Sequence, residues 1–555
     1  MGRCSRRPNR VDIMDNNLAR RERGRNSARR PVPKPDARRL IRPVINDVSA
    51  AGLQRKRKVP ALLQSLWEQQ AANGLCRTSR ALSARGGIYF LQWVVVLIIC
   101  GGIAALAVAA PSLLGGLFSA AIGLIFLALI VLRLVASLTP PRWASRESLS
   151  DDQLPRASII IALYKEARVF RGLVTSLTAI DYPADRLEIK FAIEASDTET
   201  LAVARACSLD HRFEIIVVPP GTPQTKPRAL NYALRFCRGK IITIHDAEDR
   251  PDPRQLRVAA ESLVAGGPKL GCVQAPLNWY NRADNWLTRQ FALEYAAHFQ
   301  ALLPLYARWG WALPLGGTSN HFNAAALRRA GGWDAYNVTE DADLGFRLHR
   351  LGYRCDVIAP ATLEEAPMRV WPWVCQRTRW LKGYAQTLAV HSRSTAALSP
   401  RGSKPALLLT IGAALLSALA HFPLVVLCVA CMASGEFIGM MRFAVPACLS
   451  LGYLAAALCA ATGMHRAGLS VRIIDLITMP LYWPLQTAAA LRALWQLLTA
   501  PYYWDKTEHG LSTDSDASCI SPLPPPSSRS QLLPASSLSP PGKPENPRVQ
   551  KKAHG

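Results

Sequence analysis

The chain has 555 residues, half of them hydrophobic, and a net charge of +27 from 66 basic against 39 acidic residues. This length predicts several domain-sized units. Residues 1–60 alone hold 18 Lys and Arg against 5 Asp and Glu, which is about half of the excess charge. Because the positive charge is concentrated there, a protein that coats nucleic acid is excluded, and we expect no nucleic-acid partner. Only Cys428 and Cys431 have a metal-like spacing, and they lie in an apolar run, so we expect no redox or metal role for them.

The first segment, residues 1–87, is basic and is expected to be largely disordered. Up to residue 60 it is rich in Arg, Pro and Asn and poor in apolar residues, so it cannot bury enough surface to offset chain entropy. We expect a solvated cytoplasmic tail that can contact anionic lipid, with an arm that binds a partner as the alternative. No apolar core follows the first basic residues, so no signal peptide is expected. A short helix is predicted over Val59–Ala72.

Two apolar zones, residues 88–138 and 405–464, predict two membrane-spanning hairpins. Each zone holds two runs that are long enough to cross a hydrocarbon core of about 30 Å. The runs are Ile88–Ala110, Leu113–Leu132, Pro405–Met432 and Phe443–Met464. Basic residues flank the outer ends of both hairpins, which places those ends in the cytoplasm by the positive-inside rule. The flanking residues are Arg80, Arg85, Arg133 and Arg142 for the first hairpin and Arg401, Lys404, His465, Arg466 and Arg472 for the second.

A fifth apolar stretch, Ile473–Ala500, lies within the next segment, residues 465–510. It is interrupted by Asp475 and two prolines and is rich in Trp and Tyr. This composition favours a helix that lies in the membrane interface over one that crosses, although a fifth crossing stays open. A polar, aromatic-led loop follows, and the Ser- and Pro-rich tail, residues 511–555, is expected to be disordered.

Residues 139–404, between the hairpins, have the composition of a soluble domain with alternating β-like runs and helical patterns. Such an alternation predicts an α/β domain with a largely parallel sheet and ligands at the carboxyl ends of the strands. The predicted strands are Ser158–Leu163, Leu187–Ile193, Phe213–Val218, Ile241–His245 and Cys272–Ala275.

Acidic and polar side chains follow the predicted strands. Tyr164 and Glu166 follow the first strand, and Glu194 and Asp197 follow the second, where they can hydrogen-bond a nucleoside; acidic turns are the alternative. The strand that ends at His245 continues into three carboxylates within four residues. Like charges this close raise one another's pKa, and a divalent cation bound to a diphosphate resolves the repulsion, although a solvated acidic turn is also possible. These carboxylates are Asp246, Glu248 and Asp249.

Three further motifs carry groups that suit a diphosphate and an acceptor. Lys226 and Asn231 lie at the entrance to a predicted helix, where they can reach phosphate oxygens. The motif 339–344 (TEDADL) supplies acids at a helix start, which suits either the helix dipole or a general base. In the motif 376–380 (QRTRW), helical spacing puts an amide, a guanidinium and an indole on one face, which also suits a helix at the membrane surface.

Taken in order over roughly 350 residues, these motifs resemble those of the membrane-embedded, processive family 2 glycosyltransferases, the group of bacterial cellulose synthase and its relatives in β-glucan, chitin and hyaluronan synthesis. The resemblance implies an α/β GT-A domain, Rossmann-like and nucleotide-sugar-binding, inserted between two groups of transmembrane helices. It also implies a multi-pass protein of the bacterial inner membrane with a cytoplasmic catalytic domain.

The resemblance also implies residue roles. Tyr164, Glu166, Glu194 and Asp197 would surround the uridine of a UDP-sugar, and Lys226 and Asn231 would line its diphosphate. Asp246 would hold Mg²⁺ or Mn²⁺ together with Glu248 or Asp249. Asp341 would be the catalytic base, Gln376, Arg379 and Trp380 would hold the pyrophosphate and the acceptor sugar, and Thr318 and Ser319 would lie at the acceptor terminus. Residues 504–510 are similar to a gating loop of that family.

The implied reaction is inverting transfer of a hexose from a UDP-sugar, with UDP-glucose as first choice, to a growing β-linked polysaccharide, coupled to export and completed by an accessory export protein. Transfer of one sugar to a lipid-linked acceptor is the alternative within enzymes, and an inactive membrane scaffold or receptor component is the alternative of another class. No cyclic-di-GMP-binding module follows the second hairpin, so regulation by that ligand is not expected.

Overall fold

The computed structural model describes residues 61–393, 402–435 and 441–504, all within one compact unit, Met1–Ser512. The expected disordered regions, 1–60 and 511–555, lie outside the described residues, as do residues 505–510 of the loop that resembles a gating loop.

A seven-stranded mixed sheet forms the centre of the α/β domain, in the order β3-β2-β1-β4-β8-β6-β9. Its strands are β1 (Ala157–Leu163), β2 (Leu187–Glu194), β3 (Phe213–Val218), β4 (Ile241–His245), β6 (Leu270–Gln274), β8 (Asn320–Asn323) and β9 (Arg354–Val357). The five strands expected from the sequence are all present, with ends that differ by at most two residues. Neighbouring strands run parallel except at β8, which pairs antiparallel with both β4 and β6.

A second, three-stranded sheet lies in the same domain, in the order β5-β10-β7. Its strands are β5 (Arg250–Pro251), β7 (Leu277–Trp279) and β10 (Thr362–Glu364). None of these short strands, nor β8 or β9, is expected from the sequence, because none forms an apolar run long enough to be recognised.

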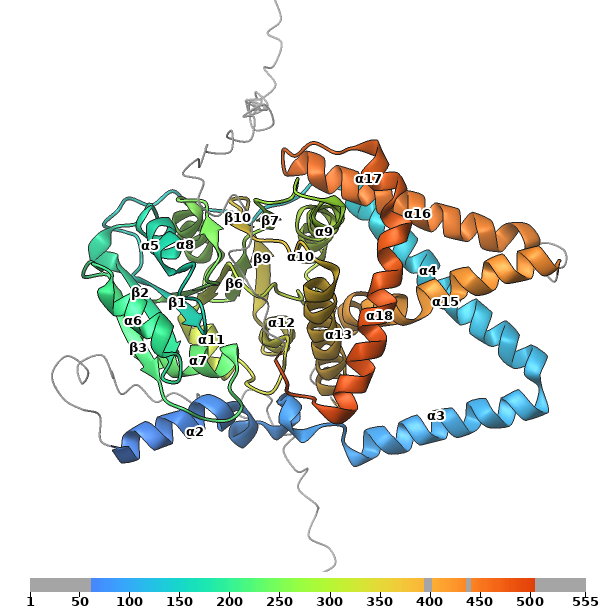
Figure 1. Cartoon of the computed structure of the whole chain (residues 1–555), viewed down its shortest axis with the longest axis horizontal. Coiled ribbons are helices and arrows are strands. Elements are labelled where there is room, and N and C mark those ends of the chain that lie inside the picture. The colour runs from blue at the N-terminus through green and yellow to red at the C-terminus, as the bar shows by residue number, and fades with distance from the viewer. Residues whose placement is uncertain (1–60, 394–401, 436–440, 505–555) are drawn as a thin grey trace, which may run out of the picture. The chain divides into compact units, whose positions relative to one another are not determined.

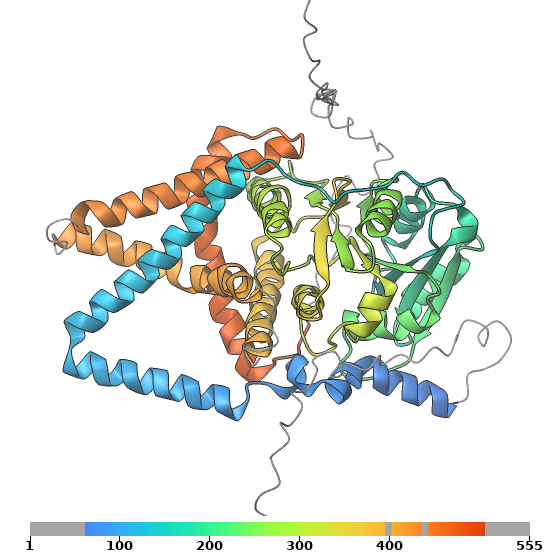
Figure 2. The same cartoon turned by 180° about the vertical axis from the view of Figure 1, so that it is seen from behind.

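Helices cover the sheets, as Figures 1 and 2 show from opposite sides. They are α5 (Phe170–Thr178), η5 (Ala184–Arg186), α6 (Thr198–Ala206), α7 (Lys226–Ala233), η6 (Leu234–Phe236), α8 (Gln255–Gly266), α9 (Trp286–Ala297), η7 (His298–Leu302), α10 (Leu303–Arg308), α11 (Ala324–Arg329), α12 (Glu340–Arg350) and α13 (Val370–Ser392). The long helix α13 lies on the side of the domain that faces the apolar helices.

Four helices among the described residues are long and apolar enough to cross a membrane: Phe90–Ala109, Pro111–Leu138, Ser403–Ser434 and Pro446–Arg466. The first two are α3 and α4; the third combines α14 (Ser403–Ala406), η9 (Leu407–Gly412) and α15 (Ala413–Ser434), and the fourth lies in α16 (Met441–Arg466). The expected α/β domain between two groups of apolar helices is therefore present. Some expected flanking residues lie inside the helices: α4 continues past Leu132 to Leu138 and includes Arg133, α14 includes Lys404, and α16 includes His465 and Arg466.

The fifth apolar stretch forms α17 (Ile473–Ile477) and α18 (Met479–Thr499), which are not among those four helices. Helix α18 packs side by side with α13 (Figure 1). The Trp373 indole of α13 donates to the Tyr482 hydroxyl of α18 at 2.9 Å, and Lys382 Nζ donates to Gln496 Oε1 at 2.8 Å. On its other side α18 contacts α15. It thus connects the α/β domain to the second apolar zone.

The chain enters the fold through α2 (Ala61–Thr78), which extends the expected helix, and through two short 3₁₀ turns, η3 (Arg80–Leu82) and η4 (Ala84–Gly86). Buried Asp334 fastens this segment, because it accepts hydrogen bonds from Ser83 Oγ at 3.0 Å and from the Ala84 backbone N–H at 2.6 Å. The N-terminal segment is therefore part of the domain's packing.

Candidate active site

One cavity of about 1360 Å³ lies at the carboxyl ends of β1, β2 and β4 and continues between the apolar helices. These three parallel strands end at the same edge of the sheet, where ligands of α/β domains bind. Eleven of the residues expected in the site line this cavity: Tyr164, Glu166, Glu194, Lys226, Asp246, Glu248, Thr318, Asp341, Gln376, Arg379 and Trp380. The structure therefore brings together side chains that are more than 200 positions apart in the sequence.

Lys226, the first residue of α7, is the cation at the centre of this edge. Its ammonium group forms an ion pair with Asp246 and donates a hydrogen bond to the Gly317 carbonyl at 2.8 Å. Burial alone would lower the pKa of Lys226, but the carboxylates of Asp246 and Glu340 raise it above its usual value. The side chain therefore keeps its positive charge inside the cavity, where it can meet a phosphate.

The carboxylates after β4 form the negative side of the site. Burial raises the pKa of Glu248 well above its usual range, and the charges of Asp246 and Asp249 raise it further. Burial, followed by the same carboxylates, also raises the pKa of Glu364, whose buried Oε1 has no hydrogen-bond partner among the described residues. A divalent cation would relieve this repulsion. In the part of the chain that the structure describes, no three His, Cys, Asp or Glu side chains converge to hold a metal ion alone, so a cation at Asp246 and Glu248 would take further ligands from a bound diphosphate.

Asp249 lies behind the cavity wall and does not line it. It is buried, and its Oδ2 interacts with the Asp246 backbone N–H at 2.9 Å, with His245 Nδ1 at 3.2 Å and with the Thr318 hydroxyl. Glu248 and Asp249 are the two alternatives for the second metal ligand, and only Glu248 lines the cavity. Asp249 instead stabilises the turn that carries Asp246.

The first turn of α12 carries two acids, Glu340 and Asp341, into the cavity. Burial and the neighbouring Asp341 raise the pKa of Glu340 to about 8. Burial also raises the pKa of Asp341, whereas Lys226 and Arg379 lower it. Thr339 occupies the N-cap position of α12, as expected. Its side chain, however, makes no capping hydrogen bond to the first turn of this helix.

Helix α13 presents Gln376, Arg379 and Trp380 to the cavity on one face, as their spacing predicts. The Gln376 Oε1 atom is buried and has no hydrogen-bond partner within the described ranges. The Arg379 guanidinium lies 4.5 Å from the ring centre of Trp504, a cation–π contact that brings the start of the C-terminal loop over the site. An amide, a guanidinium and two indoles therefore surround one part of the cavity.

Glu194 lines the cavity but is already paired inside the protein. Arg228 of α7 donates two hydrogen bonds to its carboxylate, at 3.0 and 2.7 Å, and both side chains are buried. This ion pair holds the end of β2 against α7. Glu194 thus shapes the wall beside Tyr164 and Glu166.

Three residues expected in the site are placed elsewhere. Asn231 does not line the cavity, because its amide donates to the carbonyls of Ala71 and Trp333 at 3.0 and 2.7 Å. Asp197 instead caps α6 and accepts from the Lys165 backbone N–H at 2.5 Å. Ser319 is buried, and its hydroxyl pairs with that of Thr362 at 2.6 Å. In each case the polar group is satisfied by other residues of the protein, and none of the three residues lines the cavity, so their contacts with donor or acceptor stay predictions.

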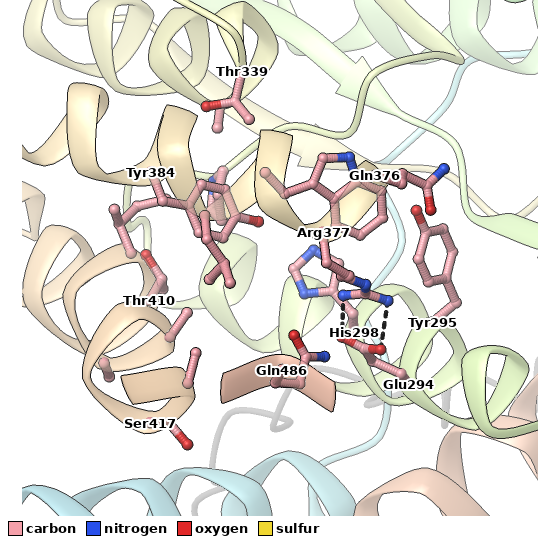
Figure 3. Close-up of a pocket in the computed structure, with 18 of the residues that line it drawn as sticks. Glu294, Tyr295, His298, Thr339, Gln376, Arg377, Tyr384, Thr410, Ser417 and Gln486 are labelled. Atoms are coloured by element: carbon pink, nitrogen blue, oxygen red, sulfur yellow. Dashed lines mark hydrogen bonds and ion pairs between the residues drawn. The ribbon is translucent and has the colours of Figure 1, made fainter. Parts of the chain in front are cut away.

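A second group of polar residues lines the cavity below α13 (Figure 3) and was not expected from the sequence. Arg377 donates two hydrogen bonds to Glu294 of α9, at 2.5 and 2.6 Å. The Tyr482 hydroxyl donates to the same carboxylate at 2.8 Å. Burial and the nearby Arg377 lower the pKa of His298 to about 4, so this imidazole is neutral at pH 7. Only Arg377 had a signal in the sequence, since it lies inside the QRTRW motif.

Comparisons with known proteins agree with this geometry. Residues 155–383 match the family model described as glycosyltransferase like family 2. The chain is 30% identical over 251 residues to a protein of Bacillus subtilis (strain 168) described as probable glycosyltransferase YdaM, a match that covers 44% of this chain and 57% of that protein. It is 27% identical over 236 residues to the beta-monoglucosyldiacylglycerol synthase of Synechocystis sp., covering 41% of this chain and 48% of that one. The chain thus spans about half the length of these curated relatives.

Among solved structures, the chain resembles the mannosyltransferase PcManGT from Pyrobaculum calidifontis, solved in complex with GDP-Man and Mn²⁺. The TM-score is 0.46, with 22% sequence identity over 68% of this chain and 98% of that one. The seven-stranded mixed sheet with its site at the carboxyl ends of β1, β2 and β4 is the expected GT-A fold.

Proposed function

We propose that the chain, whose residues 155–383 match the family model described as glycosyltransferase like family 2, transfers one hexose from UDP-glucose, with inversion, to a hydroxyl group of a membrane lipid. The observation that carries this proposal is the continuous cavity, which joins Asp341 to the space between the apolar helices. A lipid can enter such a cavity from the bilayer and bring its polar end to the catalytic domain.

The walls of the membrane part of the cavity support a lipid acceptor. Small and aliphatic side chains predominate there, including Gly115, Gly116, Ile122, Gly123, Leu424, Leu427 and Leu449. Such walls suit acyl chains, whereas a polysaccharide would leave its hydroxyl groups without hydrogen-bond partners. The similarity to the beta-monoglucosyldiacylglycerol synthase of Synechocystis sp. also favours a lipid product.

In the proposed reaction Asp341 takes the proton of the acceptor hydroxyl. The hydroxyl oxygen then attacks the anomeric carbon of the donor sugar, a new C–O bond forms, and the bond from that carbon to the UDP oxygen breaks with its electron pair leaving on UDP. One displacement inverts an α-linked donor to a β-linked product. Burial raises the pKa of Asp341, which makes it a better base than a free aspartate while Lys226 and Arg379 keep it ionisable.

Charge on the departing UDP is balanced by groups on both sides of the donor. Lys226 and Arg379 stand at the cavity and can bind diphosphate oxygens. Asp246 and Glu248 would hold Mg²⁺ or Mn²⁺, which neutralises the leaving diphosphate when bound. Tyr164 and Glu166 follow β1 and would contact the uridine.

A processive synthase of a β-linked polysaccharide is the second candidate. Gln376, Arg379 and Trp380 line the cavity in the arrangement that the resemblance to cellulose synthase implies. This candidate needs an export route, which four spanning helices would complete only with an accessory protein. It predicts a polymer, whereas transfer to a lipid predicts a product with a single added sugar.

The experiment that tests the proposal uses membranes that contain the full chain, incubated with radiolabelled UDP-glucose, UDP-GlcNAc or UDP-galactose and Mg²⁺ or Mn²⁺. We expect label from UDP-glucose in the chloroform-soluble fraction. The Asp341→Asn variant should lose transfer by at least about a thousandfold, since it removes the base, and should still bind UDP. Turnover retained by this variant would contradict the role of Asp341.

A further inference from the structure

Arg133 is a charged residue inside a membrane-spanning helix, where a charge needs compensation. It lies five residues before the end of α4, about 8 Å along the helix axis from Leu138. Its side chain lines the cavity, and it forms no ion pair or side-chain hydrogen bond with any residue that the structure describes. Ionisable residues at such depth are costly and usually face a partner or a ligand.

Arg466, the last residue of α16, is an arginine of the same region with a purely structural role. Its guanidinium donates four hydrogen bonds to backbone carbonyls, two of them in α4: Ala136, Ser137, Thr139 and Gln300, at 2.8 to 3.1 Å. Arg133 makes no bond of this kind to the described chain, although carbonyls of the same helix end are close by. A role in fastening helices therefore does not explain Arg133.

The described surroundings of Arg133 are polar but carry no compensating negative charge. Electrostatic interactions connect it to Tyr306 of α10 and Cys459 of α16, both neutral at pH 7. His421 of α15 also lies within electrostatic range of Arg133, and its Nε2 is 3.1 Å from the Tyr453 hydroxyl. Four elements thus contribute to a polar pocket in the membrane part of the cavity, and all of these residues line it.

The same cavity joins this pocket to Asp341. Tyr306 of α10 lies within electrostatic range of both Arg133 and Tyr384. Tyr384 of α13 lies in turn within electrostatic range of Asp341. All four side chains line the one cavity, so a ligand that occupies it can contact both Arg133 and Asp341.

We propose that Arg133 binds the phosphate of an anionic acceptor lipid, so that a hydroxyl of the lipid's headgroup reaches Asp341. A guanidinium pairs with phosphate through two parallel hydrogen bonds, and this pairing supplies the negative charge that balances Arg133. The acyl chains then lie between the apolar helices. The inference rests on the proposed lipid acceptor and adds its chemical class: a phosphate-bearing lipid rather than a neutral one such as diacylglycerol.

The test uses the full chain in phosphatidylcholine nanodiscs that also contain either phosphatidylglycerol or diacylglycerol, with labelled UDP-glucose and Mg²⁺. The protein should transfer glucose to phosphatidylglycerol with a kcat/KM at least about tenfold above that for diacylglycerol. Arg133→Gln should reduce kcat/KM for phosphatidylglycerol about tenfold to a hundredfold, mainly through KM, and Arg133→Lys, which keeps the charge but loses the two parallel hydrogen bonds, should recover only part of it. Arg308→Gln, at an exposed arginine of α10, is the matched control and should change nothing.

UDP binding measured by thermal shift separates a misfolded variant from a variant with a weakened lipid site, because Arg133 is expected to leave UDP affinity unchanged. Equal use of both lipids by the unaltered protein, or equal kinetics of Arg133→Gln and the unaltered protein, would overturn the role of Arg133 and leave lipid transfer standing. If the label were found only in a water-soluble polymer, that result would contradict both the proposed transfer to a lipid and the role of Arg133.

Discussion

Two adjacent acids at the start of α12, Glu340 and Asp341, are buried together. Burial and the charge of Asp341 raise the pKa of Glu340 to about 8, so the two carboxyl groups resist being ionised at the same time. Burial raises the pKa of Asp341, and Lys226 and Arg379 counteract this shift. The two carboxyl groups therefore titrate as a coupled pair, in which Lys226 and Arg379 favour the ionised form of the proposed base, Asp341.

The pH profile of transfer should report this arrangement. Because Asp341 must be ionised to accept a proton, the acid limb of kcat/KM should lie above pH 3.8, the pKa of a free aspartate. Arg379 lowers the pKa of Asp341, so Arg379→Gln should move the limb to higher pH as well as reduce the rate. Transfer rates measured across the acidic range test this, and a limb that stays in place or moves to lower pH in the variant would contradict it.

Asp334, which fastens the N-terminal segment, should make stability depend on pH. Burial and the nearby Asp343 raise its pKa from 3.8 to about 6, so the folded state binds this proton more tightly than the unfolded state. Stability from this group is therefore greatest below about pH 4, falls by up to ~3 kcal/mol as pH rises to about 6, and is then constant. Melting temperatures of the purified protein and of Asp334→Asn, compared across this window, isolate the effect. A difference between the two that does not change with pH would contradict it.

Helix α16 packs closely against α9 at Gly463. A Cβ atom at Gly463 would lie 2.3 Å from the Ala296 carbonyl oxygen, so no larger side chain fits without moving one helix. Gly463→Ala should destabilise the protein by about 1–3 kcal/mol and lower its melting temperature in detergent. Gly102→Ala in α3, where a Cβ meets no described atom within 4 Å, is the matched control. Equal melting temperatures for the two variants would show that α16 does not pack on α9 in this way.

Elements differ in how far the sequence predicts them. The five expected strands are apolar runs bounded by turns, and all except the edge strand β3 are largely buried in the sheet, which is why their pattern is recognised in the sequence. Strand β8 reads Asn-His-Phe-Asn, and its polar side chains are satisfied only by partners distant in sequence, such as the Thr243 hydroxyl, 2.8 Å from His321 Nδ1. No local pattern reveals such a strand.

The same limit applies to the site. Residues directly after a strand or on one helix face, such as Lys226 and Gln376, line the cavity as their positions predict. Asn231 has an equally suitable position, but its side-chain amide donates hydrogen bonds to the backbone carbonyls of Ala71 and Trp333. These contacts form only in the tertiary fold, so the local sequence does not reveal them. Conversely, Glu294 and Tyr384 line the cavity although their local sequences carry no motif.

At the scale of the whole molecule, the four apolar helices and their basic flanks predict one orientation. Both ends of each hairpin, and therefore the catalytic domain, should lie in the cytoplasm. Green fluorescent protein joined before Met1 should fluoresce, and alkaline phosphatase inserted between Ala110 and Pro111 should be active, because that turn faces the other side. Inactive phosphatase at the turn in a protein that retains transfer would contradict this orientation.

The cavity that joins Asp341 to the apolar helices is the basis of the account, and the product of the reaction tests it most directly. Membranes with the full chain, supplied with UDP-glucose, would be extracted with chloroform and methanol and the extract analysed by mass spectrometry, with the anomeric configuration read by NMR. The account predicts a lipid that has gained one hexose in a β-linkage and that is missing from membranes carrying Asp341→Asn. A ladder of hexose increments in the aqueous phase, with no glycolipid in the extract, would contradict it.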